Sequence, residues 1–149
     1  MPILGAIAGD IIGSIYERCP PENLDFPLFS PESRFTDDSV MTIATTSALL
    51  GDRDFGAAYR HWGLRYPRAG YGSGFHAWLQ SDDPQPYNSW GNGSAMRVSP
   101  VAWFATSESE ALDLARESAL PTHNHPRGCH PERSPHSGRS RRISEVGTV

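Results

Sequence analysis

The chain has 149 residues, 38% of them hydrophobic, and a formal net charge of −4, and this length suits one domain with a buried core. All 13 basic residues are arginine, and the acidic excess before residue 127 argues against a nucleic-acid backbone as the main partner, although a small phosphorylated ligand needs only local donors. Two distant cysteines, Cys19 and Cys129, predict neither a disulfide framework nor a metal site, so a reducing cytoplasm is the expected compartment.

Residues 3–17 predict a helix with a glycine at every fourth position from Gly5 to Gly13. Such a bare strip lets another helix approach closely, and packing must then compensate for about 1 kcal/mol per glycine relative to alanine. Asp10 and Glu17 are spaced to put both carboxylates on one helix face. Alternatively, Asp10 caps a neighbouring helix and Glu17 is an ordinary exposed residue at a helix end. Because Asp10 interrupts the apolar run, the segment predicts neither a signal peptide nor a membrane span.

Thr36, Asp37 and Asp38 stand where a loop becomes a helix, which is predicted to end near Leu50. Closely spaced hydroxyl and carboxylate oxygens suit a hard cation such as Mg²⁺. The same residues are typical of a helix start, because threonine is a good N-cap and aspartate in the first turn complements the helix dipole. Taken alone, these residues favour the helix cap.

Two further helices are predicted before the middle of the chain. Residues 54–66 form a helical pattern whose aromatic stripe is expected in the core. Residues 70–80 begin with three alternating glycines, from Gly70 to Gly74, and predict a turn that leads into a short helix. The glycine spacing matches neither the dinucleotide fingerprint nor the P-loop, so it is weak support for phosphate binding.

A loop containing Gly91, Asn92 and Gly93 leads into a helix start of small residues. Backbone N–H groups at such a start form a ready anion site. Arg97 follows inside an otherwise apolar turn. A buried arginine needs a partner, which could be a structural carboxylate or a ligand phosphate, and the sequence leaves both open.

Ser107 and Glu110 have the spacing of a capping box and predict a helix that ends near Ala119. His123 and His125 follow in a His-Asn-His-Pro run. No cysteine or third histidine stands nearby at a zinc-type spacing, so hydrogen bonding to a ligand or to loop backbone is the favoured interpretation.

The composition changes abruptly at Arg127. Residues 127–149 are rich in Arg, Pro, Ser and His and contain few apolar residues, so they cannot bury a core face and are expected to be disordered. The expected organisation is a globular part over residues 1–126 and an aberrant tail over residues 127–149.

Four motifs resemble the ADP-ribosylglycohydrolase family, in order and spacing, over roughly residues 3–126. They are the Gly-Ala-Ile-Ala-Gly-Asp-Ile-Ile-Gly run with Glu17, then Phe-Thr-Asp-Asp-Ser, Gly-Asn-Gly-Ser-Ala-Met-Arg and Thr-His-Asn-His-Pro. Four motifs in the right order are far more specific than any one of them. The resemblance implies an all-α helical bundle that is truncated here at its C-terminal side.

The same resemblance implies two Mg²⁺ ions in a central cleft, with Thr36, Asp37 and Asp38 as metal ligands. Glu17, Asp37 and Asp38 would be the catalytic residues, with Glu17 beside the scissile ribose. The residues expected to line the ADP-ribose pocket are Asn92, Gly93, Ser94, Met96 and His123. The implied reaction is hydrolysis of the bond between ADP-ribose and a modified side chain, in which metal ions orient water and a carboxylate helps to activate it. The expected partner is an ADP-ribosylated substrate or ADP-ribose, bound by a monomer without a direct nucleic-acid or membrane partner.

The family continues beyond the histidine motif and supplies a second acidic metal-binding segment. No acidic pair follows Asp82 and Asp83 here, and those two are expected in a solvated turn. We therefore expect half of the metal shell and little or no activity. A frameshift near Arg127 would explain the change in composition, and the other reading frames of the locus would test it. The alternatives are a module that binds ADP-ribose without turnover and an inactive fragment that folds poorly because its apolar faces are uncovered.

Overall fold

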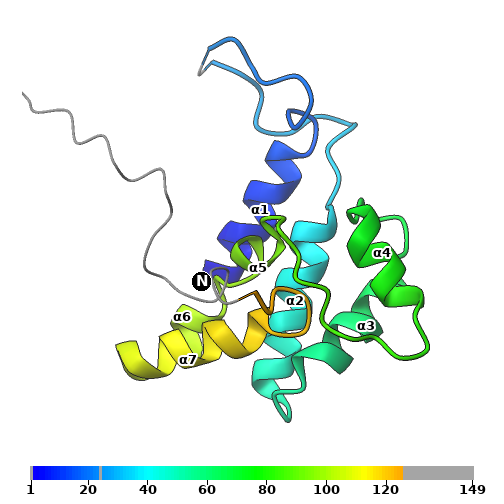
Figure 1. The fold of residues 1–149 in the computed structure, drawn as a ribbon. Helices are drawn as coiled ribbons and strands as arrows, with labels where there is room; N and C mark the ends of the chain where they lie inside the picture. The colour runs from blue at the N-terminus through cyan, green and yellow to red at the C-terminus, as the bar shows by residue number, and fades with distance from the viewer. Residues whose placement is uncertain (1, 24, 126–149) are drawn as a thin grey trace, which may run out of the picture.

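The computed structural model describes residues 2–23 and 25–125, and the regular secondary structure within these ranges is all α-helical (Figure 1). The helices are α1 (Pro2–Gly13), α2 (Asp37–Leu50), α3 (Phe55–Arg65), α4 (Ser73–Gln80), α5 (Gly93–Met96), α6 (Val101–Phe104) and α7 (Glu108–Ala119). The predicted all-α class is confirmed. No helix in the described ranges has the length and apolar character needed to cross a membrane. The predicted tail over residues 127–149 lies outside the described residues.

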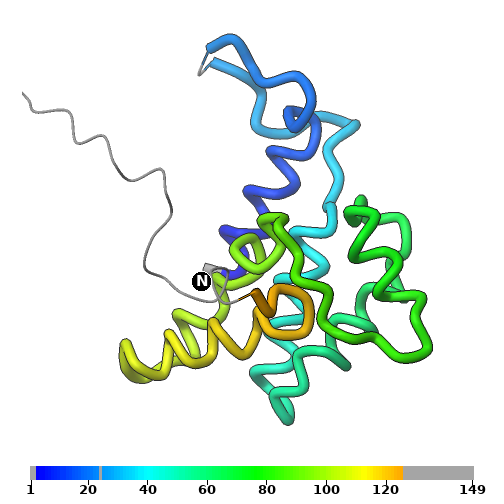
Figure 2. Tube along the Cα trace, in the orientation of Figure 1, coloured from blue at the N-terminus to red at the C-terminus, as the bar shows by residue number. Residues whose placement is uncertain are grey.

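Helix α2 runs through the middle of the molecule and packs against α1, α3, α5 and α6 (Figures 1 and 2). Most of its side chains are buried, including polar ones. The Thr45 hydroxyl returns to the helix itself, where its Oγ1 donates to Met41 O at 2.9 Å, and the Ser39 hydroxyl donates to Asp10 of α1. A central helix needs such internal partners, because a polar group removed from water costs free energy unless it is hydrogen-bonded.

The core joins α2 to α3 and α4. From α3, Phe55 is buried, and Trp62 and Tyr66 pack against the same cluster, so the prediction that this aromatic stripe belongs to the core is confirmed. Helices α3 and α4 approach closely at Gly63, where an added Cβ would lie 2.7 Å from Leu79 Cδ2. A glycine is therefore required for this helix contact.

Helix α1 is shorter than predicted, and no described helix packs on its glycine strip as expected. It ends at Gly13, where the Ser14 hydroxyl turns back to Ile11 O, so Asp10 and Glu17 do not share a helix face and that prediction is wrong. None of the described side chains of α1 is buried. A Cβ added to any glycine of the strip would meet nothing within 4 Å, so no described segment packs there.

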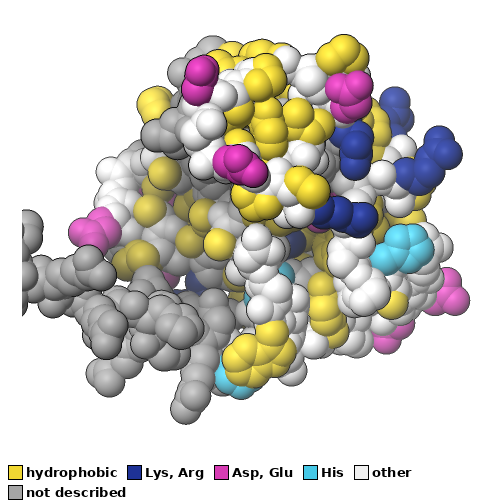
Figure 3. Space-filling view, turned by 90° about the horizontal axis from the view of Figure 1, so that it is seen from above, with side chains coloured by type: hydrophobic (Ala, Val, Ile, Leu, Met, Phe, Trp, Pro, Cys, Tyr) yellow, Lys and Arg dark blue, Asp and Glu magenta, His cyan; other side chains and the backbone are white. Residues whose placement is uncertain are grey.

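A long connection joins α1 to α2 at the upper end of Figure 1. Leu28, Phe29 and Phe35 expose 56%, 60% and 47% of their surface. Figure 3 looks down on this side and shows hydrophobic side chains gathered among acidic ones. These three side chains therefore belong to the surface and not to the core.

Helix α7 begins as predicted, because the Ser107 hydroxyl accepts a hydrogen bond from the Glu110 N–H at 3.2 Å. The reciprocal half of the capping box is displaced by one residue. The Glu110 carboxylate accepts from the N–H and the hydroxyl of Thr106, at 2.8 and 2.7 Å. Ser107 is thus confirmed as the N-cap. The Glu110 carboxylate binds Thr106, whereas a capping box predicts that it binds the Ser107 N–H.

Candidate functional site

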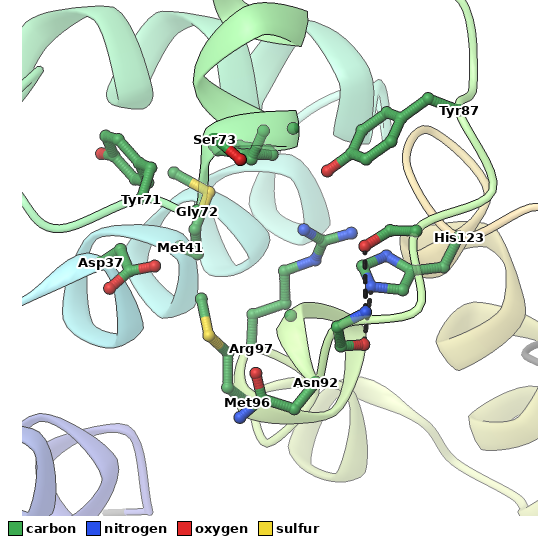
Figure 4. A pocket seen from close by; sticks show the side chains of 15 residues that line it. Asp37, Met41, Tyr71, Gly72, Ser73, Tyr87, Asn92, Met96, Arg97 and His123 are labelled. Atoms are coloured by element: carbon green, nitrogen blue, oxygen red, sulfur yellow. Dashed lines mark hydrogen bonds between the residues drawn. The ribbon is translucent and has the colours of Figure 1, made fainter. Parts of the chain in front are cut away.

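One cavity of about 270 Å³ lies between α2, α4 and α5 (Figure 4). The segment before α5, over residues 87–92, and the segment after α7, at His123, complete its wall. The predicted site residues that line it are Asp37, Asn92, Gly93, Met96 and His123. They come from the start of α2, the beginning and end of α5, and the segment after α7. Motifs that are far apart in the sequence therefore meet at one place.

Glycines let the walls of this cavity approach one another. A Cβ added to Gly93 would lie 3.3 Å from His123 Cε1, and one added to Gly74 would lie 3.1 Å from Tyr87 Cε2. Gly72 of the same alternating run also lines the cavity. The run therefore shapes the wall by leaving side-chain space, which explains its presence without a P-loop spacing.

A chain of hydrogen bonds orients the imidazole of His123. Its Nε2 lies 3.1 Å from Gly91 O, a group that can only accept, so Nε2 carries the proton. Its Nδ1 lies 2.7 Å from the Thr122 hydroxyl, which accepts from Arg97 Nη2 and so donates to the ring. Burial, and after it the charge of Arg97, lowers the pKa of His123. These contacts favour the neutral ring with its proton on Nε2.

Arg97 is deeply buried in the wall of the cavity, with 1% of its surface exposed. Its Nη2 donates to Ser118 O at 3.1 Å and to Thr122 Oγ1 at 2.7 Å, and its guanidinium carbon lies 4.0 Å from the centre of the Tyr59 ring. Burial lowers the pKa of the guanidinium. Among the described residues no carboxylate lies within salt-bridge distance of Arg97, and its Nε is buried without a hydrogen-bond partner. The alternative of a structural carboxylate partner therefore finds no support in the part of the chain that the structure describes.

Asp10 is a capping residue for the first turn of α2. Its carboxylate accepts hydrogen bonds from the N–H and hydroxyl groups of Thr36 and Ser39, at 2.5 to 3.1 Å. Thr36 is itself the N-cap, and its hydroxyl accepts from the Asp38 N–H at 3.4 Å. The interpretation of Asp10 as a cap for a neighbouring helix is confirmed, and so is that of Thr36 as an N-cap.

Asp37 and Asp38 open toward different hollows. Asp37 lines the cavity described above, whereas Asp38 lines a second hollow of about 330 Å³ together with Asp10 and Glu17. Burial, and after it the charge of Asp38, raises the pKa of Asp37 to about 6. Burial, and after it the charge of Asp10, raises the pKa of Asp38. These carboxylates form an acidic cluster that no arginine among the described residues neutralises by a salt bridge.

A family model for ADP-ribosylglycohydrolase matches residues 2–132 of the chain. The chain belongs to the ADP-ribosylglycohydrolase family. Membership confirms the resemblance seen in the four motifs and agrees with the helical fold. The class of function that it supports is that of an ADP-ribosylglycohydrolase-like hydrolase.

In this ADP-ribosylglycohydrolase chain the acidic cluster fits a hard cation by its chemistry. Asp37 and Asp38 supply the oxygen ligands that Mg²⁺ prefers, and a divalent charge would offset their mutual repulsion. The described residues contain no group of three or more His, Cys, Asp or Glu side chains placed to hold a metal ion. The Thr36 hydroxyl is already bonded to Asp10. The metal-ligand role of Thr36, Asp37 and Asp38 therefore stays a prediction.

The remaining predicted residues of the ADP-ribosylglycohydrolase site are less central. Glu17 is exposed, and neither Thr36 nor Ser94 lines either hollow. The sequence-based prediction missed Met41, Tyr71, Phe75 and Tyr87 of the cavity wall and left open whether Arg97 faces a ligand. The hydroxyl of Tyr71 is buried without a partner, as is Arg97 Nε. The glycine run beside Tyr71 and the buried arginine were the two available signals.

Proposed function

We propose that the cavity of about 270 Å³ binds the ADP-ribose moiety of a modified substrate, and that the neighbouring acidic cluster serves Mg²⁺-dependent hydrolysis of the bond that joins ADP-ribose to that substrate. The observation that supports this most is the meeting of Asp37, Asn92 and His123 in one cavity. Three of the motifs shared with the family supply these residues. We also infer, from the sequence, a monomeric and cytoplasmic protein.

The binding half of the proposal rests on the loop around Asn92. His123 Nε2 is hydrogen-bonded to Gly91 O, so the imidazole holds this loop in position from the cavity side. The Asn92 amide offers both donors and acceptors to a sugar or nucleotide. Gly93 and Ser94, at the start of α5, keep the adjoining backbone free of bulky side chains. The neutral ring of His123 adds apolar surface without a charge.

The catalytic half of the proposal uses the carboxylates. Glu17 and Asp38 share the second hollow, where an exposed carboxylate such as Glu17 can accept the proton of an attacking water. Thr36, Asp37 and Asp38 would hold Mg²⁺, which when bound polarises ribose hydroxyls and orients water. Asp37 would then face the ligand cavity and Asp38 the side on which water arrives.

A second candidate function is binding of ADP-ribose without turnover. It is favoured by the incomplete set of metal ligands among the described residues and by the divergence of Asp37 and Asp38 into two hollows. Two ions fixed close together need more carboxylates than these. If this second candidate is correct, the 149-residue chain binds ADP-ribose with little or no hydrolysis.

Two measurements separate the candidates. Calorimetry with ADP-ribose, with and without Mg²⁺, measures binding, and release of ADP-ribose from a modified protein measures turnover. Asn92→Ala should weaken binding by about two- to tenfold, the value of one hydrogen bond, whereas Asn23→Ala in the exposed connection should not. Absence of ADP-ribose binding by the wild-type chain would refute the proposal, and rapid Mg²⁺-dependent release would exclude the non-catalytic candidate.

A further inference from the structure

The cavity has one strongly basic side chain in its wall, that of Arg97, and one acidic side chain, that of Asp37. We propose that Arg97 is the charge partner of a phosphorylated ligand in this cavity, an assignment that rests on the proposed function in placing the diphosphate of ADP-ribose there. The ligand would then lie with its phosphates toward Arg97 and its uncharged sugar toward Asp37.

The charge of Arg97 is not compensated by a carboxylate among the described residues. A guanidinium with 1% of its surface exposed has lost nearly all of its contact with water. Such a group is normally paired with an anion, because neutral hydrogen bonds replace only part of its hydration. Here its partners are the carbonyl of Ser118, the hydroxyl of Thr122 and the face of the Tyr59 ring. None of these groups carries a negative charge.

Arg97 also keeps an unused donor on a guanidinium that is held in place. The described hydrogen bonds of Arg97 leave from Nη2, toward the end of α7, and they hold the guanidinium in place. Its Nε has no partner. Figure 4 shows the side chain rising among the lining residues with its guanidinium toward Tyr87. A fixed guanidinium with an unused donor is suited to a phosphate oxygen.

The start of α5 supplies little charge of its own. Its backbone N–H groups were the predicted anion site, but α5 is a single turn of 4 residues. The N–H groups of Ala95 and Met96 are already bonded to Asn92 O. So short a helix has little dipole, and Arg97 adds a full positive charge beside it in the cavity wall.

The competing interpretation is that Arg97 only ties α5 to the end of α7. Ligands that differ in charge distinguish the two roles. The full chain and Arg97→Met would be titrated with pyrophosphate, ADP-ribose and uncharged adenosine. We expect Arg97→Met to lower the affinity for pyrophosphate and for ADP-ribose by at least about tenfold, while the affinity for adenosine changes by less than about twofold. Arg97→Lys should bind the two charged ligands more tightly than Arg97→Met. Equal losses for charged and uncharged ligands, or no loss, would overturn the assignment.

Arg60→Met is the matched control. Arg60 also donates to a backbone carbonyl, that of Ser81 at 2.7 Å, but it does not line the cavity. Arg60→Met should leave the pyrophosphate affinity unchanged. A fall in affinity as large as that of Arg97→Met would count against the proposal. The control removes the same formal charge from the chain, so it corrects for long-range electrostatics.

A measurement on the wild-type chain keeps the test valid if Arg97→Met does not fold. The side-chain N–H of Arg97 should give a slowly exchanging nitrogen resonance, because Nε is buried. Pyrophosphate should shift that resonance along its binding curve, and an unchanged resonance at saturation would refute the contact. Pyrophosphate binding without ADP-ribose binding would refute the proposed function but not the anion site. Failure of pyrophosphate to bind would refute the anion site.

Discussion

The carboxylate of Asp10 on α1 accepts hydrogen bonds from both the N–H and the hydroxyl of Ser39 in the first turn of α2, at 3.1 and 2.5 Å. The same carboxylate binds the N–H and hydroxyl of Thr36. One side chain of α1 thereby satisfies the start of the central helix. The position of the neighbouring Asp37 and Asp38 depends on this contact.

Replacing Asp10 with alanine should destabilise the chain by about 2–4 kcal/mol, because four donors lose a charged acceptor in a part-buried site. Urea denaturation monitored by circular dichroism measures the free energy of unfolding. Asp113→Ala on the exposed side of α7 is the control and should stay within about 0.5 kcal/mol. Similar losses in the two variants would contradict the capping role of Asp10.

Alanine at two glycines should have opposite effects. At Gly63 the added Cβ would lie 2.7 and 2.8 Å from the methyl carbons of Leu79, which is 2% exposed and would have to shift within the core, so we expect destabilisation by about 1–3 kcal/mol. At Gly5 the Cβ meets nothing, and the better helix propensity of alanine should stabilise by up to about 1 kcal/mol. Thermal melts of both variants test this. Destabilisation by Gly5→Ala would indicate that another segment or molecule packs on the glycine strip.

Helix α1 should open more readily than α2. No described side chain of α1 is buried, whereas Val40, Met41 and Ala44 of α2 are almost fully buried. Local opening of α1 exposes little additional surface, so its amides should exchange with solvent faster than those of α2 under native conditions. Hydrogen exchange measured by mass spectrometry on peptides from both helices tests this. Equal protection would show that α1 and α2 unfold only together.

His123 should make the chain less stable as the pH decreases through about 6.5, an effect opposed by Asp37, whose raised pKa makes the folded state take up a proton near pH 6. Burial and the charge of Arg97 lower the folded-state pKa of this ring below that of the unfolded chain. The unfolded state then binds more protons, so stability is fully present above the unfolded pKa and is lost as the pH falls. Urea midpoints at pH 7.5 and pH 5.5 measure the loss. His123→Gln should remove this contribution to the pH dependence, whereas His76→Gln at an exposed position should not. A pH dependence unaltered by His123→Gln would refute this origin.

Local chemistry explains which parts of the fold were predictable. Thr36 and Ser107 mark helix starts that the structure confirms, because an N-cap depends on residues within one turn of itself. The end of α1 was placed too late, since Ser14 Oγ returns to Ile11 O and the extended helix is not formed. Element boundaries depend on such single contacts, and the apolar pattern does not contain them.

By itself, the sequence determined the helical class, the family and the set of motifs that meet at the cavity, because these depend on residue type and order. Only the tertiary structure showed that no carboxylate among the described residues lies within salt-bridge distance of Arg97, since this is a matter of distance across the fold. It also placed Asp37 and Asp38 in separate hollows although they are adjacent in the chain. Successive residues of a helix point about 100° apart, so what each one faces is set by the neighbours that pack around it.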